Sequence, residues 1–131
     1  MRVSHVLVVG LFCGLFSTTC HAQGVRVVRP VPGYMCMLLS PEDEQATVQS
    51  QLPPVLAGPS PSAERIGYPS GIVFVTSPLH QVAGYVEMLR LNGQTGWIEA
   101  NHLRPWHPMN NTSSKCVPSL MSNGRLGADV H

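Results

Sequence analysis

Charged residues are scarce in this chain, which carries eight Lys and Arg and seven Asp and Glu among 131 residues. They form no basic run, so the electrostatic attraction that dominates binding to nucleic acid or to anionic lipid is missing. The apolar run Val6–Phe16 has 11 residues, whereas a membrane-spanning helix needs about 20. The sequence therefore predicts neither a nucleic-acid partner nor membrane insertion of the mature protein.

Metal-ligand spacing is also lacking. A zinc site needs three or four convergent ligands, usually with two of them only a few positions apart. His102 and His107 are five positions apart in a proline-containing segment, and His80 and His131 lie far from both. We therefore expect no metal and no cofactor, and no motif in the chain marks a catalytic residue.

The first 22 residues have the order of a signal peptide. Arg2 precedes the apolar run, and the small and polar segment 17–22 follows it. Cys20 and Ala22 are small residues two positions apart, as a signal peptidase requires, so we predict cleavage after Ala22. An uncleaved anchor and lipidation of Cys20 are the alternatives. Cleavage would place the mature protein in the periplasm or outside the cell.

Removal of residues 1–22 leaves 109 residues, seven basic and seven acidic side chains, and two cysteines. A chain of this length supports one compact domain. Thiols outside the cytoplasm tend to be oxidised, so we predict a disulfide between Cys36 and Cys116. The alternative is a small cysteine hydrolase, in which one of these sulfurs is a thiolate with His102 or His107 as its base.

Three segments follow the leader: an arm and first strand with a short helix (23–51), a β-rich segment (52–105) and a tail (106–131). In the β-rich segment, short apolar runs alternate with Pro, Gly and Ser, which is typical of an all-β barrel or sandwich. Ile72–Val75 is continuously apolar and predicts a strand covered on both faces. The tail is rich in turn residues and has few core candidates.

Within residues 23–51 the pattern changes from extended to helical. Val25–Pro32 predicts an extended arm, because its prolines oppose a helix. Tyr34–Leu39 predicts a short strand. Ser40 is suited to cap a brief helix with Pro41 at its first position.

The clearest local prediction is a hairpin between Tyr85–Leu91 and Thr95–Ala100. Asn92 and Gly93 lie between the two strands, and this dipeptide favours the positive φ angles of a tight turn. Alternation places Val86, Met88, Ile98 and Ala100 on one face, which we expect to be the core. The opposite face should carry Tyr85, Glu87, Trp97 and Glu99.

Four segments and one isolated residue occur in the order expected of a known domain: Val55–Gly67, Gly71–Val75, Gly84–Met88, Asn92–Ile98 and Leu103. In this order they resemble a bacterial Src-homology-3-like domain. The resemblance covers residues 52–105, about half of the mature chain. It implies a small, partly open barrel of five or six short strands, of a kind that exported bacterial proteins use to hold cell-wall peptides or a neighbouring domain. It implies no catalysis by the barrel.

The resemblance also points to a ligand surface. Tyr85 falls where eukaryotic relatives place a groove Trp, His102 falls near a groove Tyr, and Glu99 replaces a groove Pro. These replacements argue against ordinary binding of proline motifs. Trp97 and Trp106 are either packing residues or further ligand contacts.

We therefore expect Tyr85, Trp97, His102 and Trp106 to be the residues that contact a ligand. The predicted function is an exported, non-catalytic binding module that recognises cell-wall (peptidoglycan) peptide or an envelope protein. The alternative is a structural or assembly subunit of the bacterial envelope, in which the barrel groove binds nothing.

Overall fold

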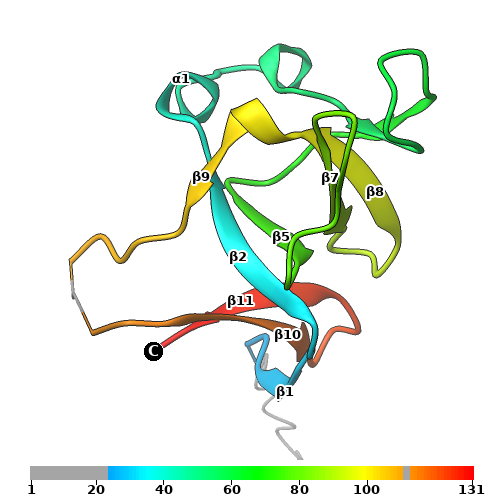
Figure 1. Ribbon diagram of the computed structural model, residues 1–131. Coiled ribbons are helices and arrows are strands. Elements are labelled where there is room, and N and C mark those ends of the chain that lie inside the picture. Colours follow the sequence, from blue (N-terminus) through cyan, green and yellow to red (C-terminus); the bar gives the residue numbers. More distant parts are fainter. Residues whose placement is uncertain (1–23, 111–112) are drawn as a thin grey trace, which may run out of the picture.

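The structure is a computed structural model that describes residues 24–110 and 113–131. Most regular elements in this part of the chain are β-strands, with one short α-helix and two 3₁₀ turns (Figure 1). In chain order they are β1 (Val27–Pro30), β2 (Tyr34–Leu39), α1 (Pro41–Glu44), η1 (Gln49–Gln51), β3 (Val55–Leu56), β4 (Arg65–Gly67), β5 (Ile72–Thr76), β6 (Gln81–Val82), β7 (Tyr85–Leu89), β8 (Thr95–Glu99), η2 (Ala100–His102), β9 (Leu103–Pro105), β10 (Cys116–Met121) and β11 (Leu126–Val130). The predicted all-β class is confirmed. The predicted leader, 1–22, lies outside the described residues.

The larger of two sheets has the strand order β4-β3-β8-β7-β5-β2-β9, and β6 pairs with β7. It is open, because among the described residues no pairing joins its end strands β4 and β9. The sequence places the β-rich segment at 52–105, but β2 is an inner strand of the same sheet, between β5 and β9. Because β2 pairs with both of these strands, the larger sheet begins in sequence at Tyr34 and not at residue 52.

The predicted hairpin is confirmed as β7 and β8, with Gly93 at a φ of +85° in its turn. Val86 lies opposite Ile98, and Glu87 lies opposite Trp97. The side chains of Val86, Met88 and Ile98 are buried in one core, as the alternation predicts. The short helix is also confirmed, since the Ser40 hydroxyl accepts a hydrogen bond from the backbone N–H of Asp43 at 3.4 Å.

Strand β5 has a core on each of its faces, as its continuous apolar run predicts. Val73 and Val75 belong to a first core, whose buried members also include Leu39, Val55, Val86, Met88 and Ile98. Phe74 belongs to a second core, in which Cys36 and Leu89 are buried. The second core is covered by a separate, smaller sheet.

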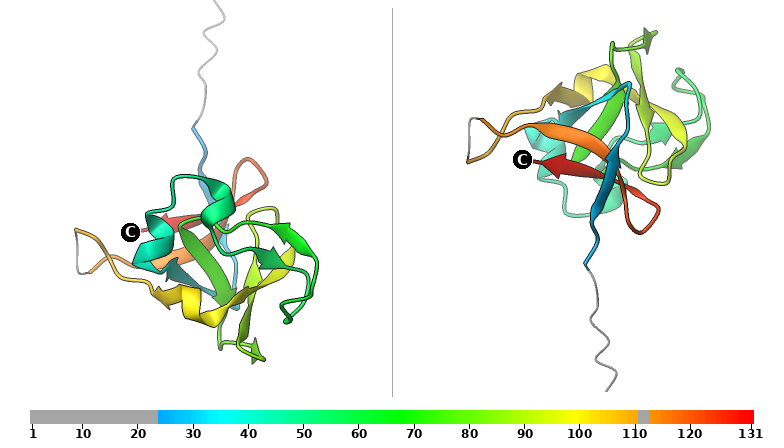
Figure 2. Two further views of the ribbon diagram at one scale, coloured as in Figure 1. Left: turned by 90° about the horizontal axis from the view of Figure 1, so that it is seen from above. Right: turned by 90° about the horizontal axis from the view of Figure 1, so that it is seen from below.

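This smaller sheet has the order β1-β10-β11 and packs beneath the larger one (Figure 2). The prediction of a turn-rich tail with few core candidates is wrong for 116–130, where β10 and β11 pair as a hairpin. Leu126 and Ala128 pack against the second core. The smaller sheet thereby covers the apolar surface of β5 and β7 in the second core. This burial explains why residues 116–130 fold as strands.

The predicted disulfide between Cys36 and Cys116 is confirmed, with an S–S distance of 2.11 Å and a Cα–Cα distance of 6.1 Å. Cys36 is in β2 and Cys116 begins β10, so the bond joins the two sheets. The N-terminal arm is extended as predicted, and part of it is β1, which pairs with β10.

Candidate functional site

The four predicted ligand residues lie in three separate environments. Tyr85 and His102 are connected through Glu99, whereas Trp97 contacts the ring of His80 and Trp106 packs on the second core. Tyr85 and Trp106 line different cavities, and neither of these cavities includes Trp97 or His102. Their role in ligand binding stays a prediction.

Tyr85 is buried, with only 6% of its surface exposed. It lines a small cavity of about 200 Å³ together with Pro53, Pro54 and Pro61. Prolines of the same chain therefore lie beside the Tyr85 ring. Burial raises the pKa of Tyr85, and the carboxylate of Glu99, which accepts a hydrogen bond from the Tyr85 hydroxyl, raises it further. Tyr85 is therefore a neutral packing residue with a polar anchor.

His102 lies between two carboxylates. Its Nδ1 is 2.8 Å from Asp43 Oδ2 and its Nε2 is 3.2 Å from Glu99 Oε2. A neutral imidazole has a single N–H, so only the imidazolium form can donate to both carboxylates at once. Burial alone would raise the pKa of Asp43, but hydrogen bonds from Ser40 and His102, with the charge of His102, lower it overall. The cluster ties α1 to η2.

Trp97 takes part in a surface cluster farther along the same hairpin face that carries Tyr85 and Glu99. Its ring contacts the His80 ring edge-on, with centroids 5.3 Å apart and an interplanar angle of 64°. His80 Nδ1 is 2.6 Å from Glu87 Oε2. Because Glu87 lies opposite Trp97 in the sheet, the three side chains form one contact group.

Trp106 follows β9 and packs against the second core beside the disulfide. It also lines an apolar hollow of about 530 Å³ with Leu38, Ile72 and Met109. Val130 of β11 also lines this hollow, which therefore lies between neighbouring ends of the two sheets. Trp106 is therefore both a packing residue and part of an apolar surface.

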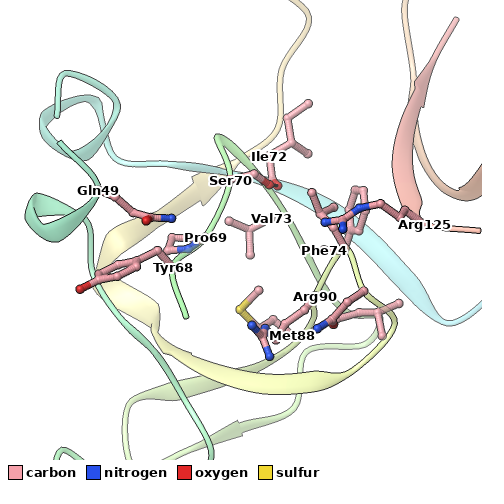
Figure 3. A pocket seen from close by; sticks show the side chains of 13 residues that line it. Gln49, Tyr68, Pro69, Ser70, Ile72, Val73, Phe74, Met88, Arg90 and Arg125 are labelled. Carbon is pink, nitrogen blue, oxygen red and sulfur yellow. Dashed lines mark hydrogen bonds between the residues drawn. The ribbon is translucent and has the colours of Figure 1, made fainter. Parts of the chain in front are cut away.

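A further cavity of about 420 Å³ lies beside β5 and the turn after β7, and Figure 3 shows it from close by. Its lining residues are Gln49, Tyr68, Pro69, Ser70, Ile72, Val73, Phe74, Met88, Leu89, Arg90, Leu91, Asn92 and Arg125. Two of them are arginines and none is acidic. Both arginines lie on the side of Phe74 and Met88 in Figure 3, opposite Gln49 and Tyr68.

Arg90, directly after β7, is held in place by its own hydrogen bonds. Its Nη2 donates to the carbonyl oxygen of Ile66 at 2.8 Å, and its Nη1 donates to Gln94 Oε1 at 3.3 Å. The guanidinium passes over Gly67, where a Cβ atom would lie 2.7 Å from Nη2. Gly67 therefore permits the position of Arg90.

Arg125 reaches the cavity from the turn between β10 and β11. The backbone N–H of its neighbour Leu126 donates to the carbonyl oxygen of Leu91 at 2.9 Å, which places Arg125 beside the segment that carries Arg90. Its own backbone N–H donates to Asn123 Oδ1 at 3.0 Å. Within the described part of the chain, the Arg125 guanidinium has no hydrogen-bond or ion-pair partner.

The cavity therefore combines two guanidinium groups with an apolar wall, which the half-buried side chains of Ile72 and Leu91 form. Like charges in one cavity repel unless an anion lies between them. Guanidinium groups bind carboxylate and phosphate through parallel hydrogen bonds. Tyr68 and Ser70 carry the hydroxyls of this cavity, and the Ser70 hydroxyl donates to the carbonyl oxygen of Ile72 at 2.7 Å and is thereby engaged as a donor. This arrangement suits the binding of an anion that carries an apolar group.

Sequence reasoning missed both arginines. Arg90 lies inside the predicted strand Tyr85–Leu91 and directly after the observed strand β7, and only the hairpin register would have marked it as a residue near the sheet surface. Arg125 lies in a segment that the sequence pattern describes as a tail, so nothing in the sequence places it near Arg90.

Among residues 24–110 and 113–131, no group of three or more His, Cys, Asp or Glu side chains is arranged to hold a metal ion. None of the helices in these ranges is long and apolar enough to cross a membrane. No family model, no curated protein and no solved structure matches the chain.

Proposed function

We propose that this protein is an exported, non-catalytic binding module that recognises cell-wall peptide or an envelope protein, and that it does so at the cavity of Arg90 and Arg125. The observation that carries the proposal is the unneutralised charge of this cavity. Two guanidinium groups share it with an apolar wall, and none of its lining residues is acidic. Peptides of the cell wall carry free carboxylates beside small apolar side chains, which is the complementary chemistry.

Two further observations support this role. The disulfide between Cys36 and Cys116 fits an oxidising compartment outside the cytoplasm. The meander β5-β7-β8, continued by η2 and then by β9 next to β2, fits the Src-homology-3-like resemblance and its small, partly open barrel. On this proposal the β-scaffold holds the two arginines in a fixed relation.

Co-sedimentation with purified peptidoglycan tests the proposal. The wild-type protein should be retained, and Arg125→Gln should be retained less, because it removes a cation whose guanidinium makes no bond within the described residues. Arg29→Gln is the matched control, since it removes the same charge from the exposed strand β1. Equal retention of wild type and Arg125→Gln, or no retention of wild type, would overturn the proposal.

The alternative, a structural subunit of the envelope, is favoured by a different surface. Val25, Val27 and Val28 are 56%, 43% and 57% exposed, and β1 is an edge strand of the smaller sheet. Exposed apolar edges of this kind pair readily with another strand. If Val28→Lys abolishes association with envelope fractions while Arg125→Gln does not, the structural role is the better one.

A further inference from the structure

We infer that the cavity of Arg90 and Arg125 binds the free α-carboxylate at the C-terminal end of a short peptide, with the last side chain against the apolar wall. This inference rests on the proposed binding function and gives it a ligand class. Nothing in the predicted ligand surface at Tyr85 and His102 contributes to it.

The two arginines have hydrogen-bond capacity to spare. A guanidinium has five N–H donors, and Arg90 uses its two hydrogen bonds to Ile66 and Gln94. Arg125 uses none of its side-chain donors within the described residues. A carboxylate accepts up to about four hydrogen bonds through two oxygens, so a single carboxylate has enough acceptor capacity for both groups.

The rest of the lining selects for a peptide end over a bare anion. Ile72 and Leu91, which are half-buried, present apolar surface in the same cavity as the two cations. Gln49 adds an amide group that can pair with a peptide backbone, whereas the amide of Asn92 is engaged with Gln94 in its own turn. The volume of about 420 Å³ lies within the range of about 300–1,000 Å³ that is usual for small-ligand sites. An inorganic anion would leave this apolar part unused.

The two arginines have different roles. Arg90 is buttressed by Ile66 and passes over Gly67, so it offers a fixed donor surface. Arg125 is exposed on a turn and is set in place through the backbone of Leu126. Arg125 therefore supplies charge that can be removed without loss of a described contact, whereas Gly67 controls the position of Arg90 without carrying charge.

Isothermal titration at low ionic strength with N-acetyl-dialanine tests the inference, because the same dipeptide can be prepared with a free carboxylate or with a carboxamide. The acid should bind the full mature protein, and the amide should bind about tenfold more weakly or not at all. Arg125→Gln should weaken binding of the acid about tenfold, and Arg29→Gln should leave it unchanged. Gly67→Ala should also weaken it, with an unchanged circular dichroism spectrum.

Each other outcome has a defined meaning. Equal binding of acid and amide overturns carboxylate recognition, while retention on peptidoglycan would still support the proposed function. Full competition by inorganic phosphate at the concentration of the acid shows a site for any anion and overturns the inference. Absence of dialanine binding overturns it as well. Binding of the acid without retention on peptidoglycan supports the inference and rejects the cell wall as the source of the ligand.

Discussion

The backbone N–H of Leu126 donates to the carbonyl oxygen of Leu91 at 2.9 Å, and this bond connects the smaller sheet to the turn after β7. Arg125 and Arg90 are the residues directly before these two, so the bond brings the two cations to one cavity. The disulfide makes a second connection between the sheets, from β2 to β10. The meeting of the two arginines in one cavity thus depends on contacts between two sheets whose residues are distant in sequence.

The disulfide between Cys36 and Cys116 should contribute to the stability of the fold. Replacing Cys36 and Cys116 together by Ala should lower the free energy of unfolding by up to about 4.5 kcal/mol, because the bond closes a loop of about 81 residues in the unfolded chain. Urea denaturation, followed by Trp fluorescence, measures the loss. Reduction of the wild type should give the same midpoint as the variant. A change below about 1 kcal/mol would show that the bond adds little to the packing of the second core.

Asp43 should make the protein sensitive to acid. Its folded-state pKa lies below the ordinary value of 3.8, so the stability from its ionised form is present above pH 3.8 and is lost as the pH falls through the lower, folded-state pKa. Asp43→Asn should therefore lower the free energy of unfolding by about 1–2 kcal/mol at pH 7, where it loses a charged hydrogen-bond partner of His102.

Urea denaturation at pH 7 and near pH 3 checks this. The gap between wild type and Asp43→Asn should shrink at the lower pH, because the wild-type carboxyl is then becoming protonated as well. Glu42→Gln is a suitable control, since it removes an exposed carboxylate from the same helix. A gap that stays constant with pH would contradict the assignment of the effect to ionisation of Asp43.

Local sequence signals predicted the local elements. Asn92 and Gly93 fixed the β7–β8 turn, and the alternation around Val86 and Ile98 identified the core face. Ser40 and Pro41 marked the start of α1. Each of these depends on residues that are close in the chain, where turn chemistry and side-chain periodicity act directly.

The smaller sheet could not be predicted in this way. Pro118 argues against an inner strand, because it has no N–H for the ladder, yet it lies within β10 and its carbonyl oxygen accepts from the N–H of Val31 at 2.8 Å. The apolar residues of β11 are few, and they are buried only because Phe74 lies beneath them. The Arg90 and Arg125 cavity depends on the same long-range packing.

Tyr85 should make stability sensitive to alkali. Its folded-state pKa is above the ordinary value of 10.0, so its contribution is complete below pH 10 and is lost as the pH rises through the higher, folded-state pKa. Tyr85→Phe keeps the ring but removes the hydroxyl beside Glu99, and should lower the midpoint of thermal unfolding at pH 8. Thermal unfolding from pH 8 to pH 11 should show the wild type losing this advantage. A parallel decline of both proteins above pH 10 would contradict the prediction.

Gly96 should tolerate no side chain, because it lies opposite Met88 where β8 crosses the first core. A Cβ atom at this position would lie 2.5 Å from Val55 Cγ1 and 3.4 Å from the backbone oxygen of Leu56. Val55 is fully buried and cannot move away freely, so Gly96→Ala should lower the free energy of unfolding by about 1–3 kcal/mol, the usual cost of overpacking. Gly71→Ala is the matched control, since a Cβ there meets no atom within 4 Å. Equal urea midpoints for the two variants would mean that β3 and β8 are packed less closely than the structure places them.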